Sequence, residues 1–304
     1  MSTAAAPGAV RPAVRVVARR RPRPARVALH LFLSVTALVW LFPLLWALYT
    51  ALRPIADTTT NGYYSVARSL SAVNFVNAWT QAQLPHFYLN TLIVAVPAVI
   101  LTLLVSSMLA FAVTRFDWRF NLPLLMMFVA GNLLPAQVII VPLYWLYLNT
   151  PVPPPLSDNG LLYDQYLGII LIHVVFQLGF SAFVLSNYMR TLPKEITESA
   201  LVDGAGVFAI WWRIILPLCR PALAALGTLL FTFIYNDFFW ALLLMKSGDK
   251  RPITSALNNL QGEFFTNYNL LGAGALLAAL PTLIVFFALQ RQLIGGLTLG
   301  STKG

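Results

Sequence analysis

Hydrophobic residues gather into six long segments along the chain, with shorter polar stretches between them. A helix needs about 20 mainly apolar residues to cross a hydrocarbon core about 30 Å thick. Six segments meet that requirement, which predicts an all-α polytopic membrane protein with six transmembrane helices. The predicted spans are residues 31–52, 87–113, 122–148, 167–189, 221–245 and 272–291.

The composition agrees with this pattern. Of the 304 residues, 59% are hydrophobic and only 10% are charged, and the mean hydropathy is +0.74. A soluble domain of this length would need many more charged residues to cover its core. The first segment is also too long for the apolar part of a cleavable signal peptide, so it is predicted to be a membrane anchor.

Basic residues are unevenly distributed. Seven arginines fall within residues 1–30, which indicates a basic cytoplasmic tail beside membrane lipid rather than a nucleic-acid-binding surface. With that tail inside the cell, 15 lysines and arginines lie on the inner side and 5 in the outer loops. The positive-inside rule therefore predicts a multi-pass protein of the cell membrane with both termini in the cytoplasm.

The sequence offers no pattern for a metal or cofactor site. The single cysteine, Cys219, has no partner for an intrachain disulfide, and the three histidines form no metal-ligand pattern. The chain also contains no G-x-x-x-x-G-K-[ST] stretch, so it has no phosphate-binding loop of that kind for ATP.

A polar stretch at residues 190–220 separates the fourth and fifth spans. Pro193 suits the first turn of a helix, and acidic residues behind it favour the positive end of that helix. This pattern predicts a short helix that ends at about Val202. Gly204 and Gly206 then permit a sharp turn.

A second short helix is expected from Val207, with an apolar side formed by Phe208, Trp211, Trp212 and Ile215, and Pro217 is expected to end or bend it. A helix that merely rests on lipid would explain the tryptophans, which favour the membrane interface. It explains the acidic residues less well, because a lipid-binding helix would carry Lys and Arg there. A protein partner fits the acids better.

The same stretch resembles a known family. Glu198-Ser199-Ala200, Asp203-Gly204-Ala205 and Ile214-x-Leu216-Pro217 resemble the EAA loop of ABC importer permeases, E-A-A-x-x-x-G-x9-I-x-L-P, with Ser199 in place of the first alanine. The stretches "AFAVTRFDWRF", "YNDFFWALLL" and "ALQRQLIGGLTLGSTKG" are similar to the carbohydrate-uptake branch, typified by the six-span maltose permease subunit. The proline-rich outer loop within residues 149–166 and the basic tail depart from that branch.

The resemblance implies a type I ABC importer permease fold over residues 31–304, with a cytoplasmic coupling helix in the loop 190–220. It implies a non-catalytic subunit that pairs with a second related permease, two ATPase subunits that bind ATP and Mg²⁺, and an external binding protein that delivers a sugar. The residues implied in coupling to the ATPase are Glu195, Glu198, Ser199, Ala200, Asp203, Gly204, Ala205, Ile214, Leu216 and Pro217.

Polar residues within the spans are candidates for the translocation path, because such residues are costly in lipid and usually face protein or water. The fifth span supplies Thr228, Thr232, Tyr235, Asn236 and Asp237. Asp237 could equally cap or pair at the outer interface between permease subunits. Elsewhere, hydrogen bonding between helices is the expected role of Asn90, Asn132, Gln137 and Gln177.

The last outer loop is polar but carries aromatic residues, which suit contact with a docked protein. The resemblance adds that the matching loop of the maltose permease subunit enters the binding protein's cleft. The residues expected to make this contact are Asn258, Gln261, Phe264 and Phe265.

Three other functions stay open on the sequence alone. A self-sufficient secondary transporter would need coupling-ion sites and commonly an internal repeat, and no pair of matching broken helices is evident. An intramembrane enzyme would need a catalytic dyad or a metal set, whereas His173 alone fits a hydrogen-bonded residue in helix packing. The third open function is a permease for a substrate other than sugar.

Overall fold

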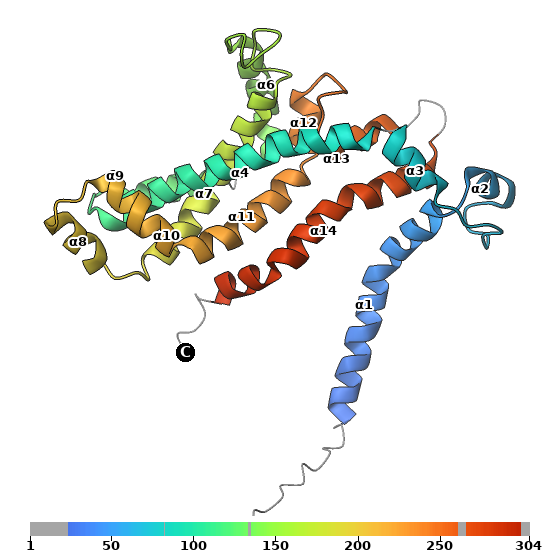
Figure 1. The fold of residues 1–304 in the computed structure, drawn as a ribbon, viewed down its shortest axis with the longest axis horizontal. Helices are drawn as coiled ribbons and strands as arrows, with labels where there is room; N and C mark the ends of the chain where they lie inside the picture. Colours follow the sequence, from blue (N-terminus) through green and yellow to red (C-terminus); the bar gives the residue numbers. More distant parts are fainter. Residues whose placement is uncertain (1–23, 82, 133–134, 261–265, 299–304) are drawn as a thin grey trace, which may run out of the picture. The chain divides into compact units, whose positions relative to one another are not determined.

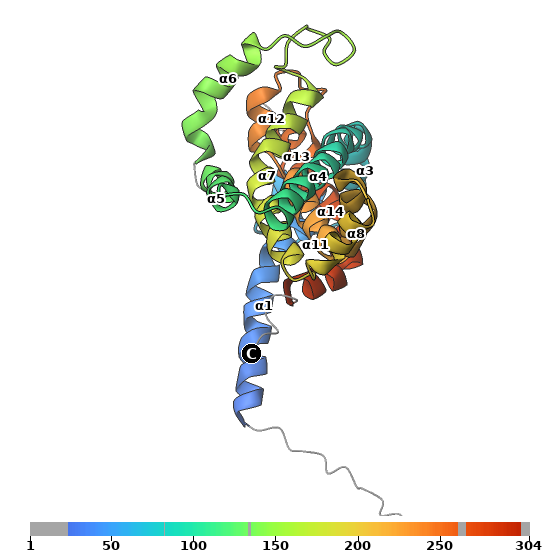
Figure 2. The same ribbon diagram turned by 90° about the vertical axis from the view of Figure 1, so that its left-hand side faces the viewer.

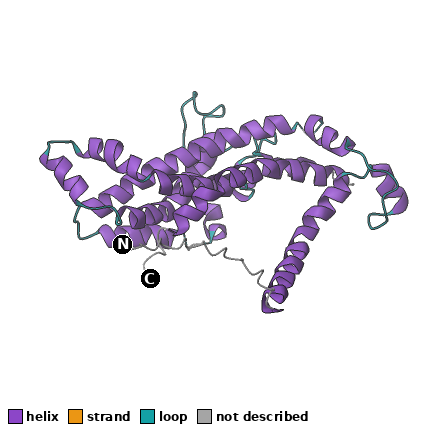
Figure 3. Ribbon diagram, turned by 60° about the horizontal axis from the view of Figure 1, so that its bottom comes forward, coloured by secondary structure: helices purple, strands orange, loops and turns teal. Residues whose placement is uncertain are grey.

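The computed structural model of the chain describes residues 24–81, 83–132, 135–260 and 266–298. Within these ranges the regular elements are helices, and the β-type contact is a single antiparallel bridge between Pro151 and Leu161 (Figure 3). The first 23 residues of the predicted basic tail lie outside the described ranges.

The chain divides into two compact units, residues 1–46 and 47–304. The first contains most of α1 (Pro24–Ala51), which includes Pro43 and is apolar on all sides. Side chains such as Phe32 and Trp40 are exposed on it. A helix of 28 residues with this surface fits a membrane span.

The second unit is built on four long helices that pack against one another (Figure 1): α4 (Leu84–Arg115), α7 (Tyr166–Met189), α11 (Arg220–Tyr235) and α14 (Tyr268–Thr298). The remaining elements are α2 (Ile55–Asn61), α3 (Val73–Thr80), α5 (Asn121–Gly131), η1 (Ala136–Ile139), α6 (Ile140–Asn149), α8 (Glu195–Val202), α9 (Val207–Ile210), a π-helical turn η2 (Trp211–Ile215), α10 (Leu216–Leu218), α12 (Phe239–Leu244), α13 (Ile253–Ala256) and η3 (Leu257–Leu260).

Helices α4 and α7 run parallel. The Tyr166 hydroxyl at the start of α7 bonds to Asn90 near the start of α4, and Arg115 at the end of α4 bonds to Met189 at the end of α7. We call these the N-end and the C-end of the bundle. Figure 1 shows α8 and α9 beyond the C-end, and α3 and α13 toward the N-end.

Four helices in the described residues are long and apolar enough to span a membrane, and six spans result if each of two bent helix pairs counts as one. The third predicted span, 122–148, is not one continuous helix, because α5 ends at Gly131. Pro135 then precedes η1, and proline removes a backbone donor and disfavours the helical conformation in the residue before it.

The fifth predicted span, 221–245, is also broken. Helix α11 ends at Tyr235 and α12 begins at Phe239. Its other end continues through a 78° bend into the residues 207–218 that precede it. The remaining predictions, 31–52, 87–113, 167–189 and 272–291, each fall on one helix, and Pro97 lies within α4 without breaking it.

Small residues allow α5 to approach α7 closely, and Figure 2 shows the two helices side by side. A Cβ added to Gly179 of α7 would lie 2.3 Å from the Phe128 carbonyl oxygen of α5. Such contact between backbones is the usual reason for glycine at a membrane helix interface.

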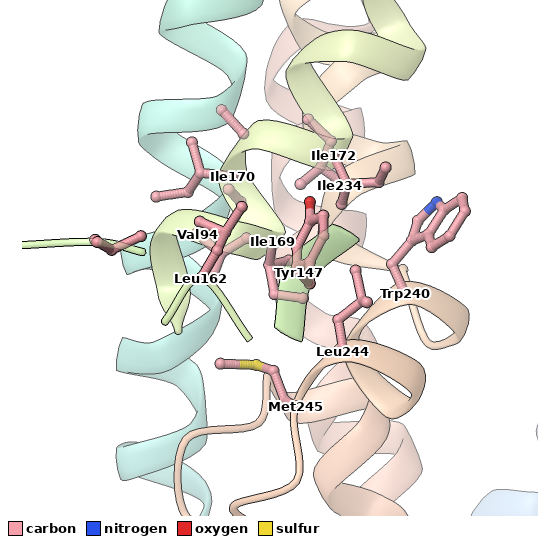
Figure 4. Close-up of a cluster of buried hydrophobic side chains, with 13 residues drawn as sticks. Val94, Tyr147, Leu162, Ile169, Ile170, Ile172, Ile234, Trp240, Leu244 and Met245 are labelled. Atoms are coloured by element: carbon pink, nitrogen blue, oxygen red, sulfur yellow. The ribbon is translucent and has the colours of Figure 1, made fainter. Parts of the chain in front are cut away.

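Buried apolar side chains join the helices at both ends of the bundle. Figure 4 shows the cluster toward the N-end, to which α4 contributes Val94, α6 Tyr147, α7 Ile169 and α12 Leu244. The Tyr147 hydroxyl donates to the Gly168 carbonyl at 2.8 Å, which satisfies its polar atom inside the cluster.

Arg53 organises the stretch that follows α1. Its side chain is fully buried, pairs with Asp57 at 2.8 Å, and donates to the Tyr63 carbonyl at 2.9 Å and the Ser65 carbonyl at 3.1 Å. Asn269 of α14 donates to the Arg53 carbonyl at 2.9 Å. A buried cation is tolerated when it is paired and hydrogen-bonded in this way.

The proline-rich loop within residues 149–166 is attached to the loop that follows α12. The Asp164 carboxylate accepts the backbone N–H groups of Lys246 and Ser247, both at 2.9 Å. Lys250 pairs with Asp158 at 2.5 Å. The sequence did not reveal this contact between two loops distant in the chain.

Candidate functional site

Helix α8 covers the predicted acidic helix, and the predicted end at Val202 is confirmed. Thr197 and Ala200 are buried on one side of it. The opposite side is exposed and combines acidic with other side chains: Glu195, Glu198, Ser199 and Val202. Leu201 and Asp203 are exposed as well. Val202 is 88% exposed.

Gly204 ends α8 in the left-handed conformation, with φ at +80°. The Ala205 N–H bonds to the Ala200 carbonyl at 2.9 Å and the Gly204 N–H to the Leu201 carbonyl at 3.0 Å. These two bonds form a Schellman motif, in which glycine is the preferred residue at the positive-φ position. The prediction of a sharp turn at Gly204 is confirmed, and Gly206 has an ordinary φ of −65°.

The second short helix begins at Val207 as predicted, and its apolar residues are only partly buried. Trp211 and Ile215 are buried, but Phe208 and Trp212 are 64% and 50% exposed, so these four residues do not share one buried side. A π-helical turn covers Trp211–Ile215. Pro217 does not stop the helix, which reaches Leu218 before Cys219 begins the bend into α11.

The buried side of this segment packs on the C-end of the bundle. Ala200, Ile210 and Ile215 belong to one apolar cluster with Phe111 of α4 and Leu185 of α7. The predicted coupling residues Ala205, Ile214 and Leu216 pack at its margin. Residues 190–220 thus form an exposed acidic helix on a buried apolar base. That base also contains Leu226 of α11, so it joins the segment to three long helices.

The five polar residues predicted for the translocation path do not form one open face. Thr228 is buried and bonds to the Ala224 carbonyl of its own helix, and Thr232 bonds to the Thr228 carbonyl in the same way. Tyr235 is buried and donates to the Ala278 carbonyl of α14 at 2.8 Å. Asn236 is the exposed member of the set.

Asp237 caps α12 within this chain. Its carboxylate accepts the backbone N–H groups of Trp240 at 3.3 Å and Ala241 at 3.1 Å. The capping role expected as an alternative is therefore present, although at a helix of the same chain. His173 is buried and its Nε2 lies 3.6 Å from the Asp237 carboxylate, too far for a hydrogen bond. The burial expected of a helix-packing His173 is present, but its Nε2 makes no hydrogen bond within the described residues.

Of the amide side chains, Asn90 joins helices as predicted, because Tyr166 of α7 donates to its oxygen at 2.8 Å. Asn132 instead bonds to the Phe128 carbonyl four residues earlier. Gln137 and Gln177 make no side-chain hydrogen bond within the described ranges.

Among the residues predicted to contact a binding protein, Asn258 is exposed in η3, whereas Gln261, Phe264 and Phe265 lie outside the described residues. The described part of the chain contains no group of three or more His, Cys, Asp or Glu side chains placed to hold a metal ion.

Comparison with known proteins places these features in a family. The sequence model described as "Binding-protein-dependent transport system inner membrane component" matches residues 102–296, which include the whole segment 190–220. An alpha-glucoside transport system permease protein of Rhizobium meliloti is 38% identical over 76% of this chain and 60% of its own length. A diacetylchitobiose uptake system permease protein of Streptomyces coelicolor is 29% identical over 90% of this chain and 88% of its own.

A similar fold is found in the crystal structure of a bacterial ABC transporter involved in the import of the acidic polysaccharide alginate. The TM-score is 0.71 at 20% sequence identity, over 87% of this chain and 95% of that one.

Proposed function

This chain belongs to the family of binding-protein-dependent transport system inner membrane components, and we propose that it is a permease subunit of an ATP-driven sugar importer. Its multi-pass membrane location follows from the family and the apolar helices, and the predicted ABC importer permease fold is confirmed. Two relatives named for an alpha-glucoside and for diacetylchitobiose support sugar as the substrate class.

The partners proposed are a second permease, two ATPase subunits that bind ATP and Mg²⁺, and an external binding protein. The N-end of the bundle, with its loops 149–166 and 246–271, would face the binding protein. The C-end would face the cytoplasm with both chain termini, which is the orientation favoured by the distribution of Lys and Arg.

The observation that carries the coupling role is the exposed side of α8. Glu198 and Val202 are exposed on this side, while Ala200 on the other side packs against the bundle. An exposed side that combines charge and hydrocarbon suits a groove on another protein, since lipid would disfavour the carboxylates. We propose that this side seats in the ATPase and that Glu198 and Asp203 meet donors or cations there.

Charge reversal tests the role of α8. The importer would be reconstituted in liposomes with its partner subunits and binding protein, and ATP hydrolysis and sugar uptake would be measured. Glu198→Lys should abolish binding-protein-stimulated hydrolysis and uptake, because an interfacial charge left without its partner typically costs about 2–5 kcal/mol. The matched control is Asp117→Lys, which reverses another exposed charge in the loop after α4, outside the segment. Normal transport by Glu198→Lys would contradict the coupling role of this residue.

The substrate class is tested separately with the unmodified importer. Binding protein loaded with glucosides or chito-oligosaccharides should stimulate hydrolysis, whereas amino acids or peptides should not. Stimulation by a solute of another class would keep the permease function and reject sugar.

A further inference from the structure

Arg115, the last residue of α4, joins that helix to the segment that leads into α8. Its guanidinium donates to the carbonyl oxygens of Met189 at 3.0 Å, Leu192 at 3.2 Å and Pro193 at 3.5 Å. Met189 ends α7, and the other two residues belong to the short linker between α7 and α8. One side chain therefore holds two helices and the linker together.

These contacts are stronger than ordinary packing. Hydrogen bonds from a charged donor are shorter and stronger than neutral ones, and the planar guanidinium can direct several at fixed angles. A cation at the carbonyl end of α7 is also favoured by the helix dipole. The ammonium group of lysine could not reproduce this arrangement.

Direction matters because the buried side of residues 190–220 is mainly apolar, although the Tyr188 hydroxyl of α7 also donates to the Leu218 carbonyl at 3.4 Å. The buried side chains of this segment share a cluster with Phe111 of α4 and Leu185 of α7. Hydrophobic contact is non-directional, so it resists separation but opposes sliding less. The bonds of Arg115 fix the linker in one position on the α4–α7 pair, only two residues before α8 begins at Glu195.

The opposite end of α4 is fastened in a similar way. Asn90 donates to the Asp249 carbonyl at 2.6 Å and the Arg251 carbonyl at 3.2 Å, and it accepts from Tyr166. The α4–α7 pair is thus bonded to the α8 linker at the C-end and to the loop after α12 at the N-end.

We propose that Arg115 is a positioning residue for energy coupling, which makes the α8 linker and the α4–α7 pair move as one body. A displacement of α8 would then reach residues 249–251 at the other end of the bundle instead of being absorbed at the linker. This inference rests on the proposed coupling role of residues 190–220. Arg115 lies two residues beyond the predicted span 87–113, and α4 extends far enough to include it in its last turn.

The test uses the complete reconstituted importer and two substitutions, Arg115→Met, which keeps most of the stem, and Arg115→Lys, which keeps the charge. The matched control is Arg119→Met, because Arg119 lies four residues later and contacts the Phe120 ring rather than the linker. Three quantities are measured: basal ATP hydrolysis, its stimulation by loaded binding protein, and the number of ATP molecules hydrolysed per sugar transported.

Arg115→Met should assemble and hydrolyse ATP at the basal rate, but the stimulation should fall at least about tenfold, the factor expected for the loss of even one of its three charge-assisted hydrogen bonds. The ATP consumed per sugar should rise accordingly. Arg115→Lys should restore part of both, and Arg119→Met should match the unmodified importer. A merely structural role would lower the yield of assembled importer and leave the ATP-to-sugar ratio unchanged.

Different results would contradict the proposed function and the role of Arg115. If the unmodified importer shows no stimulation by its binding protein, the proposed function is wrong. The role of Arg115 alone is overturned by a different result. In that result the unmodified importer is stimulated and Glu198→Lys abolishes the stimulation, but an assembled Arg115 variant keeps normal stimulation and a normal ATP-to-sugar ratio. Should Arg115→Met not assemble, Arg115→Lys decides alone.

Discussion

Asn90 and Tyr166 meet at the N-end of the bundle, where the Tyr166 hydroxyl donates to the Asn90 side-chain oxygen at 2.8 Å. Because Asn90 also donates to two carbonyls of the loop after α12, one nearly fully buried amide serves three partners. Removing it leaves the Tyr166 hydroxyl and the Arg251 carbonyl without these bonds, whereas the Asp249 carbonyl keeps its contact with His86 Nε2 at 2.7 Å.

Asn90→Leu should therefore destabilise the protein by about 1–3 kcal/mol for each buried group that finds no water. Tyr166→Phe removes one bond only and should cost less. Thermal unfolding of the purified chain in detergent measures both midpoints, and the double variant shows whether the two effects are coupled. Equal midpoints for Asn90→Leu and the unmodified chain would show that this contact contributes no stability.

Gly204 should tolerate no side chain. Its φ of +80° costs a non-glycine residue about 1–2 kcal/mol, although a Cβ there would meet no other atom within 4 Å. Gly204→Ala should weaken the end of α8, and Gly204→Val should do so more severely because valine is β-branched. Hydrogen exchange at the Ala205 amide measures this weakening.

The control for Gly204 is Gly206→Ala. Gly206 also has open space around it, but its φ of −65° suits alanine, so this change should be neutral or slightly stabilising. Equal exchange rates in the two alanine variants would contradict a role for the positive φ.

Gly179→Ala should separate α5 from α7. The new methyl group would lie 2.3 Å from the Phe128 carbonyl oxygen and 2.6 Å from the Asn132 side chain, so the helices must move apart. We expect a lower unfolding midpoint, since overpacking typically costs about 1–3 kcal/mol. Gly131→Ala in α5, where a Cβ would meet nothing within 4 Å, is the control and should not lower the midpoint.

Much of the helical pattern was predictable, because a stretch of apolar residues long enough for a membrane leaves few alternatives to helix. The α8 turn was predictable for the same kind of reason, since glycine favours positive φ locally. The end of α5 at Gly131 was not predictable, because Pro97 lies within a helix while Pro135 precedes a new one. The break at residues 236–238 has no proline or glycine to indicate it. Neighbouring contacts decide between these outcomes.

The partners of single side chains were also beyond the sequence. Nothing in the pattern near Tyr235 indicates that its hydroxyl bonds to α14, or that the helix capped by Asp237 belongs to the same chain. Asp237 and His173 lie on segments far apart in the chain, and only their packing brings them within 3.6 Å. Burial and polarity alone predict that such residues have partners, without identifying them.

The pairing of Asp158 with Lys250 should respond to acid. Hydrogen bonds from Lys250 and Gln165 lower the pKa of the Asp158 carboxyl to about 2. Since an aspartate in an unfolded chain has a pKa of about 3.9, the contribution of this pair is complete above about pH 4 and disappears as the pH falls toward 2.

Amide exchange in the loop 149–166, corrected for the intrinsic effect of pH, should therefore be constant from neutral pH to about pH 5 and increase below about pH 4. Asp158→Asn removes the titrating group and should show faster exchange at every pH, without the acid-dependent step. An identical acid response in this variant would assign the step to another group.

Labelling in intact cells tests whether the N-end and the C-end of the bundle lie on opposite sides of the membrane. Leu156→Cys lies in the loop 149–166 and Ser199→Cys on α8, and both positions are exposed, whereas Cys219 is buried. A membrane-impermeant maleimide should modify the first and not the second until the membrane is permeabilised. Immediate labelling of Ser199→Cys would reverse the proposed orientation.

The bonds of Asp164 to the loop after α12 also constrain the order in which the protein can mature on the ribosome. The donors to its carboxylate, the backbone N–H groups of Lys246 and Ser247, are synthesised 82 and 83 residues later. At about 5–20 residues per second, the proline-rich loop waits roughly 4–16 s for them. Helices α4 and α7 are complete by Met189 and can pair earlier. A nascent chain arrested before residue 246 would thus carry an assembled α4–α7 pair beneath a loop still open to proteases.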